Sequence, residues 1–146
     1  MSLDALKLEN QLCHRLYATT NAFTRAYRPL LEPLGLTYPQ YIVLMSLWER
    51  DNIPIQQLID HTHVDGGSLT QILNKLQNKG LLQLKVDAED ARKRRVVLTE
   101  AGQALKLKAA QVPQQMICQL QDMSLESAVQ LAQLLDQLHK SLTALP

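Results

Sequence analysis

The chain has 146 residues, the length of one domain, and its two cysteines lie too far apart in sequence for a disulfide framework. The N-terminus lacks the apolar core of a signal peptide, and no apolar run approaches the roughly 20 residues of a membrane span. These features argue against a secreted or membrane protein and indicate a cytoplasmic one. Low aromatic content, few glycines and abundant Leu, Gln and Ala indicate a mainly helical protein. The net charge of +1 hides a basic centre, because residues 71–108 carry 9 basic and 4 acidic side chains. Such a centre fits either a site for a polyanion or an ordinary solvated surface.

The N-terminal part of the chain predicts one long helix over residues 5–33. Residues at spacings of three and four form its apolar face: Cys13, Leu16, Thr20, Phe23, Tyr27 and Leu30. Pro33 and Gly35 predict its end. On this face Cys13 is either a small buried hydrophobic residue or a reactive thiol.

Three shorter helices are predicted next. Thr37 is a suitable cap for the first of them. Pro54 opens the second, over residues 55–61. The third ends near Lys79, with Gly80 at its C-terminal cap. We expect the first of these helices to turn the following side chains inward: Tyr41, Ile42, Leu44, Met45 and Trp48.

The period of the sequence then changes from helical to alternating. Residues 82–86 and 96–98 predict two short strands around a charged loop. A further helix begins at about residue 99 with a bend at Pro113, and Ser124 caps a last helix that ends near residue 143. Short helices followed by a β-hairpin are typical of a winged helix-turn-helix. We therefore expect a mainly α fold with a small β-hairpin, in which residues 37–100 form the DNA-binding region.

The helix before the hairpin has one apolar and one polar face. Ser, Thr, Gln and Asn side chains can read base edges in a major groove, and lysines suit phosphates. We expect Lys79 at the end of this helix to bind a phosphate. The other predicted DNA contacts of the helix are Ser68, Thr70, Gln71, Asn74 and Lys75.

The charged loop between the strands contains four consecutive cations, residues 92–95. Asp87 and Asp90 precede them and are expected to hold one arginine by a charge-assisted pair. We assign Arg92 to that role. Arg94 is then predicted to enter a narrow minor groove, with Lys93 as a second DNA contact. The alternative interpretation is a solvated basic loop.

The stretch from Leu81 to Gly102, with D-A-E-D-A-R and V-V-L-T-E-A-G, resembles the MarR family of winged-helix transcriptional regulators. The resemblance extends over essentially the whole chain. It implies a single domain, residues 1–146, in which residues 1–33 and 109–146 form dimerisation helices. It also implies a homodimer that binds a pseudo-palindromic operator in double-stranded DNA, usually as a repressor.

The N-terminal half narrows this resemblance. L-E-N-Q-L-C at 8–13, Y-R-P-L-L at 27–31 and P-L-G-L-T-Y-P-Q-Y at 33–41 resemble the organic-hydroperoxide-sensing, OhrR-type branch. In that branch the cysteine that matches Cys13 reacts with the peroxide, and the tyrosines that match Tyr27 and Tyr38 donate hydrogen bonds to it. The resemblance to two-cysteine members implies that Cys118 resolves the oxidised thiol as an intersubunit disulfide.

The thiolate is the reactive form of cysteine, so a sensor needs neighbours that stabilise it. In a helix over residues 5–33, Cys13 lies more than two turns inside, beyond the reach of the helix dipole. Phenol donors can take this role instead. Helical geometry separates Cys13 from Tyr27 by about 21 Å. Their contact therefore requires Tyr27 of a second subunit whose first helix runs antiparallel.

The sequence thus predicts a repressor that releases its operator when an organic hydroperoxide oxidises Cys13. Two alternatives stay open. A small phenolic ligand, bound between the dimerisation and winged regions, would release DNA without thiol chemistry. A thiol peroxidase is disfavoured because no cysteine is predicted at a helix N-terminus. We expect no enzymatic activity, no cofactor and no metal site, including at the H-x-H-x-D segment of residues 61–65.

Overall fold

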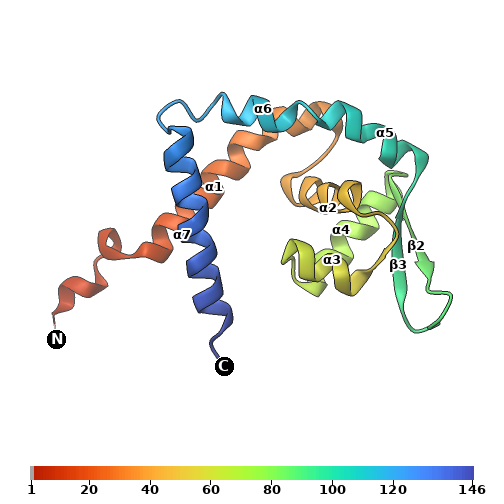
Figure 1. The fold of residues 1–146 in the computed structure, drawn as a ribbon, viewed down its shortest axis with the longest axis horizontal. Helices are drawn as coiled ribbons and strands as arrows, with labels where there is room; N and C mark the ends of the chain where they lie inside the picture. Colours follow the sequence, from red (N-terminus) through yellow and green to blue (C-terminus); the bar gives the residue numbers. More distant parts are fainter. Residues whose placement is uncertain (1) are drawn as a thin grey trace. The chain divides into compact units, whose positions relative to one another are not determined.

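The computed structural model describes residues 2–146. The chain forms two compact units, Met1–Val112 and Pro113–Pro146. No helix among residues 2–146 is long and apolar enough to cross a membrane. In the first unit, Figure 1 places α2, α3 and α4 beside a small sheet. The helices are α1 Leu12–Leu31, α2 Tyr38–Glu49, α3 Ile55–Thr62, α4 Gly66–Asn78, α5 Glu100–Ala109, α6 Val112–Ile117 and α7 Leu125–Thr143, and the strands are β1 Ile53–Pro54, β2 Leu82–Val86 and β3 Arg94–Leu98.

The first helix is shorter than predicted. Leu3–Leu6 and Leu8–Asn10 are short 3-10 helices, and α1 begins only at Leu12. Amide side chains bond to backbone carbonyls before that point, Asn10 to Asp4 at 2.7 Å and Gln11 to Ala5 at 2.6 Å. Such bonds compete with the α-helical ladder. The predicted helix start at residue 5 is therefore wrong.

The N-terminal cap of α2 and the glycine after α4 agree with the sequence analysis, and the structure adds an N-terminal cap on α4. Thr37 and Gln40 form a reciprocal capping box at the start of α2. Asp65 caps α4, because its carboxylate accepts the backbone N–H of Ser68 at 2.9 Å. Gly80 follows α4 with φ of +74°, the left-handed conformation that glycine adopts without steric cost. These local signals set the bounds of the two helices.

The hydrophobic core lies between α2, α3, α4 and the sheet. Leu44 and Leu47 of α2 are fully buried. Met45, predicted to face inward, is 37% exposed, because it lies on the opposite side of α2 from Leu47. The remaining fully buried side chains of this core include Leu58, Leu69, Leu73, Leu76 and Val96.

The sheet has one strand more than predicted. Its order is β1-β3-β2, with antiparallel pairs throughout. Leu82 pairs with Leu98 and Val86 with Arg94, so β3 begins two residues before the predicted start at Val96. The extra strand β1 has two residues, one of them Pro54, which suits an edge position. A strand this short has no alternating pattern by which sequence reasoning can find it.

The predicted start of a helix near residue 99 and the predicted cap Ser124 agree with the structure. Thr99 caps α5 and Ser124 caps α7. The helix expected to bend at Pro113 is instead two helices, α5 and α6. The large apolar side chains of α7 are exposed: Leu125, Val129, Leu131, Leu134, Leu135 and Leu142.

Candidate DNA interface and thiol site

The polar face of α4 is open to solvent, as the sequence predicts. Leu69, Leu73 and Leu76 of the same helix are buried against the core, which fixes the rotation of α4 about its axis. The hydroxyl of Thr70 donates to the carbonyl of Gly66 at 2.9 Å, so it offers DNA mainly a methyl group and an acceptor. The residues presented on the open face are Ser68, Thr70, Gln71, Asn74 and Lys75.

The wing, residues 82–98, is shaped by two acidic side chains. Asp90 accepts hydrogen bonds from the backbone N–H of Arg92 at 3.0 Å and from its Nε at 3.2 Å. These two bonds lower the pKa of Asp90, the backbone bond more than the side-chain bond. The predicted pair between Arg92 and Asp90 is therefore present, although the Arg92 side chain is 91% exposed. Lys93 and Arg94 are exposed beside it, where DNA can reach them.

Asp87 is held by a different arginine from the one predicted. Arg95 Nη1 lies 3.2 Å from Asp87 Oδ2, and only 13% of the Asp87 side chain is exposed. A backbone N–H bond from Glu89 and then the Arg95 contact lower the pKa of Asp87. Arg95 Nε also donates to Asn52 Oδ1 at 2.9 Å, and its Nη2 donates to the carbonyl of Asn52. Arg95 thus joins the wing to the turn between α2 and β1.

Sequence reasoning missed this role of Arg95. Asn52 lies 43 residues before Arg95, so no local spacing links the two. The sequence carries no signal for this contact.

The two tyrosines predicted to contact the thiol lie together. The rings of Tyr27 on α1 and Tyr38 on α2 have centroids 4.7 Å apart, and Tyr41 lies 5.9 Å from Tyr27. Burial raises the pKa of all three phenols, and the charges of Tyr38 and Tyr41 raise that of Tyr27 further. The phenols therefore stay protonated at neutral pH and keep their O–H donors. Tyr41 was expected in the core and not in this cluster.

Cys13 lies at a different place in its helix from the one predicted. Because α1 begins at Leu12, Cys13 is in its first turn, where the helix dipole favours negative charge. The expectation that the dipole cannot act on Cys13 is therefore wrong, and so is the argument that the chain has no cysteine at a helix N-terminus. Both Cys13 and Cys118 are exposed, free thiols. The helical distance of about 21 Å between Cys13 and Tyr27 still holds, since α1 contains both.

Two cavities adjoin the tyrosine cluster. One of about 330 Å³ is lined by Thr20, Phe23, Tyr27 and Tyr38. The other has a volume of about 280 Å³. Tyr38 lines both cavities, and the second also includes Thr24, Arg28, Glu32, Leu36, Thr37 and Pro39.

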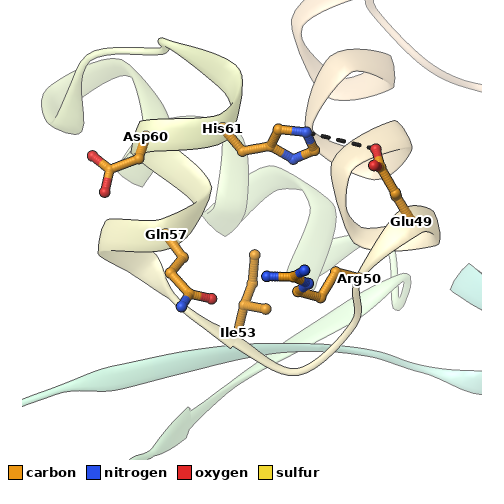
Figure 2. A pocket seen from close by; sticks show the side chains of 6 residues that line it. All are labelled: Glu49, Arg50, Ile53, Gln57, Asp60 and His61. Carbon is orange, nitrogen blue, oxygen red and sulfur yellow. Dashed lines mark ion pairs between the residues drawn. The ribbon is translucent and has the colours of Figure 1, made fainter.

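Figure 2 shows a further cavity, of about 610 Å³, between α2, β1 and α3. His61 lies at its edge, with Nδ1 2.6 Å from Ser46 Oγ and Nε2 3.6 Å from a Glu49 carboxylate oxygen. Both ring nitrogens thus have partners within the protein. Among residues 2–146, no three His, Cys, Asp or Glu side chains are grouped to hold a metal ion. None of the predicted sensing or DNA-contacting residues lines this cavity, so it lies outside the candidate sites.

Comparison with known proteins decides the family. The MarR family model matches residues 34–93. The chain is 42% identical to the organic hydroperoxide resistance transcriptional regulator of Bacillus subtilis (strain 168). The 110 aligned residues cover 75% of this chain and 75% of the Bacillus protein. This chain belongs to the MarR family. The same identity supports the predicted resemblance to the organic-hydroperoxide-sensing branch.

Solved structures of AbfR from Staphylococcus epidermidis are similar to this MarR-family chain. Reduced AbfR bound to DNA matches with a TM-score of 0.78 and 26% identity, over 97% of this chain and 99% of that one. Disulfide-formed AbfR matches with a TM-score of 0.64 and 26% identity, over 92% of this chain and 94% of that one. The winged-helix fold is confirmed, and the chain is a DNA-binding transcriptional regulator; the proteins it matches are regulators rather than enzymes.

Proposed function

We propose that this protein is a redox-responsive repressor that leaves its operator when an organic hydroperoxide oxidises Cys13. One observation carries the proposal: Cys13 is exposed in the first turn of α1, in a chain 42% identical to a regulator named for organic hydroperoxide resistance. The exposed polar side chains of α4 and the wing tip residues Lys93 and Arg94 contact the DNA. The operator is a pseudo-palindrome, because two copies of α4 read two half-sites.

The active form is a homodimer. Leu12 is 60% exposed and Phe23 37% exposed on α1, while Leu125 of α7 is 83% exposed. Exposed apolar side chains along whole helices are typical of an interface that a partner covers. A second copy with an antiparallel α1 also brings its Tyr27 toward Cys13, which the same chain's Tyr27 cannot reach. Dimerisation then completes the sensor.

The proposed chemistry has two balanced steps. The Cys13 thiolate attacks the peroxide, so that an S–O bond forms, the O–O bond breaks and an alkoxide leaves, which takes a proton from solvent to become the alcohol. The Cys118 thiolate of the partner subunit then attacks the sulfenic sulfur, so that an S–S bond forms, the S–O bond breaks and hydroxide leaves, which takes a proton to become water. Protonated Tyr27 and Tyr38 of the partner subunit donate hydrogen bonds to the Cys13 sulfur before the first step. The AbfR structures support this order, because they include a reduced, DNA-bound state and a disulfide state.

The test combines operator release with non-reducing electrophoresis. Wild-type protein treated with cumene hydroperoxide should lose operator binding and form a covalent dimer. Cys118→Ser should abolish the covalent dimer, and Cys13→Ser should abolish both responses. A Cys13→Ser protein that still leaves its operator on treatment would disprove the proposal.

A second candidate function is release by a small phenolic ligand without thiol chemistry. The cavity of about 330 Å³ beside Tyr27 and Tyr38 favours it, since its lining is mainly aromatic. Release of operator by a simple phenol from protein in which both cysteines are replaced by serine would support this candidate. Retention of the operator under those conditions would exclude that phenol as the signal.

A further inference from the structure

Lys79 connects two parts of the protein that have separate roles. It is the C-cap residue of α4, the helix that presents the predicted base contacts. Its ammonium group donates to the carbonyl of Gly35 and to Gln40 Oε1, the latter at 2.9 Å. Both acceptors belong to the segment 35–40, which also contains Tyr38. One side chain therefore reaches from the DNA-reading helix to the segment that holds a predicted sensor residue.

The acceptors of Lys79 are themselves held in place. Gln40 is only 3% exposed, and its Oε1 also accepts the backbone N–H of Thr37 at 3.1 Å as part of the α2 capping box. Gly35 has φ of +69°, and its N–H is bonded to the Glu32 carbonyl at 2.9 Å. In addition, a cation at the C-terminus of α4 is favoured by the helix dipole. The position of the ammonium group is thus specified from both elements.

We propose that Lys79 is a positioning residue, which ties α4 to the segment carrying Tyr38 and transmits changes at the Tyr27–Tyr38 pair to the DNA-reading helix. The transmitting half of this inference rests on the proposed redox function. Lys79 is then not a phosphate ligand, because its ammonium uses two of its three donors inside the protein. Lys75 is the matched control, since it is exposed on the same helix, whereas the ammonium of Lys79 is bonded to Gly35 and Gln40.

The first experiment separates positioning from phosphate binding and needs no oxidant. Binding of Lys79→Met and Lys75→Met proteins is measured against salt concentration, on a duplex selected from a random pool by the wild-type chain. Loss of a phosphate contact lowers the slope of log K against log salt by about one per contact. We expect Lys75→Met to lower the slope and Lys79→Met to leave it unchanged. An equal loss of slope in Lys79→Met would overturn the proposal.

The second experiment tests transmission, with Cys13 oxidation and operator release measured separately. After cumene hydroperoxide treatment, Lys79→Met should lose the Cys13 thiol at the wild-type rate. The ratio of oxidised to reduced operator Kd should nevertheless fall about tenfold relative to wild type, the scale of a typical coupling between sites. Lys79→Arg, which keeps the charge and the donors, should restore the wild-type ratio and guards against a folding defect. A wild-type ratio in Lys79→Met would overturn the transmitting role. If the peroxide oxidises Cys13 in neither the wild type nor the variants, the redox function is overturned, and the result of the salt experiment still stands.

Discussion

Mixed dimers test whether the sensor is built by one chain or shared by two. One dimer pairs a Cys13→Ser subunit with a Tyr27→Phe subunit. The control pairs a subunit carrying both substitutions with a wild-type subunit. Both dimers contain one Cys13 and one Tyr27, so they differ only in whether the two residues share a chain. Because α1 runs without a break from Leu12 to Leu31, the two residues of one chain stay about 21 Å apart.

The expected result follows from that distance. In the first dimer the remaining Cys13 faces the remaining Tyr27 across the interface, and in the control it faces a phenyl ring. A hydrogen bond to a charged group contributes about 1.5–3 kcal/mol, so the control thiol should be oxidised about 10 to 150 times more slowly. The assay is rapid-quench thiol labelling after cumene hydroperoxide, in a Cys118→Ser background. Faster oxidation in the control than in the first dimer would refute a sensor shared between subunits.

Three further changes test the fold and the wing. Gly102→Ala should lower the free energy of unfolding by about 3 kcal/mol, because an added Cβ would lie 2.0 Å from the backbone carbonyl oxygen of Leu81. Urea titration at fixed protein concentration measures this loss, and a value below about 1 kcal/mol would contradict the packing. Leu44→Ala, at a fully buried position, should cost about 2–5 kcal/mol, whereas Met45→Ala, 37% exposed, should cost much less, and equal costs would refute the observed rotation of α2. Arg95→Met should weaken operator binding indirectly, because Arg95 holds the wing in place. Adding Arg94→Ala to Arg95→Met should therefore cost less binding free energy than Arg94→Ala costs in the wild type. Fully additive losses would mean that Arg95 contacts DNA itself.

The sequence was most reliable where one residue decides the local backbone. Thr37 and Ser124 cap their helices as predicted, because a capping side chain bonds to a backbone N–H within three residues. The alternation over residues 82–86 likewise predicts the observed strand β2. Such interactions are complete within a few residues, so the sequence contains all the information that they need.

The start of the first helix was not predicted from its apolar pattern. Burial does not set this boundary, because Leu8 before it and Leu12 after it are 62% and 60% exposed. The side chains of Asn10 and Gln11 bond to the carbonyls of Asp4 and Ala5 and compete with the helical ladder, so α1 begins at Leu12. This difference moved Cys13 into the first helical turn and reversed the argument about the helix dipole.

The contacts that assemble the candidate sites were decided by tertiary structure alone. Arg95 meets Asn52 across 43 residues, and Lys79 meets Gly35 across 44. Residue types suited to binding DNA or sensing peroxide could be proposed from the sequence, because they follow from the chemistry of single side chains and from the family resemblance. The sequence could not show which arginine holds Asp87 or which lysine bonds to Gln40, because only the folded backbone brings those partners within hydrogen-bonding distance.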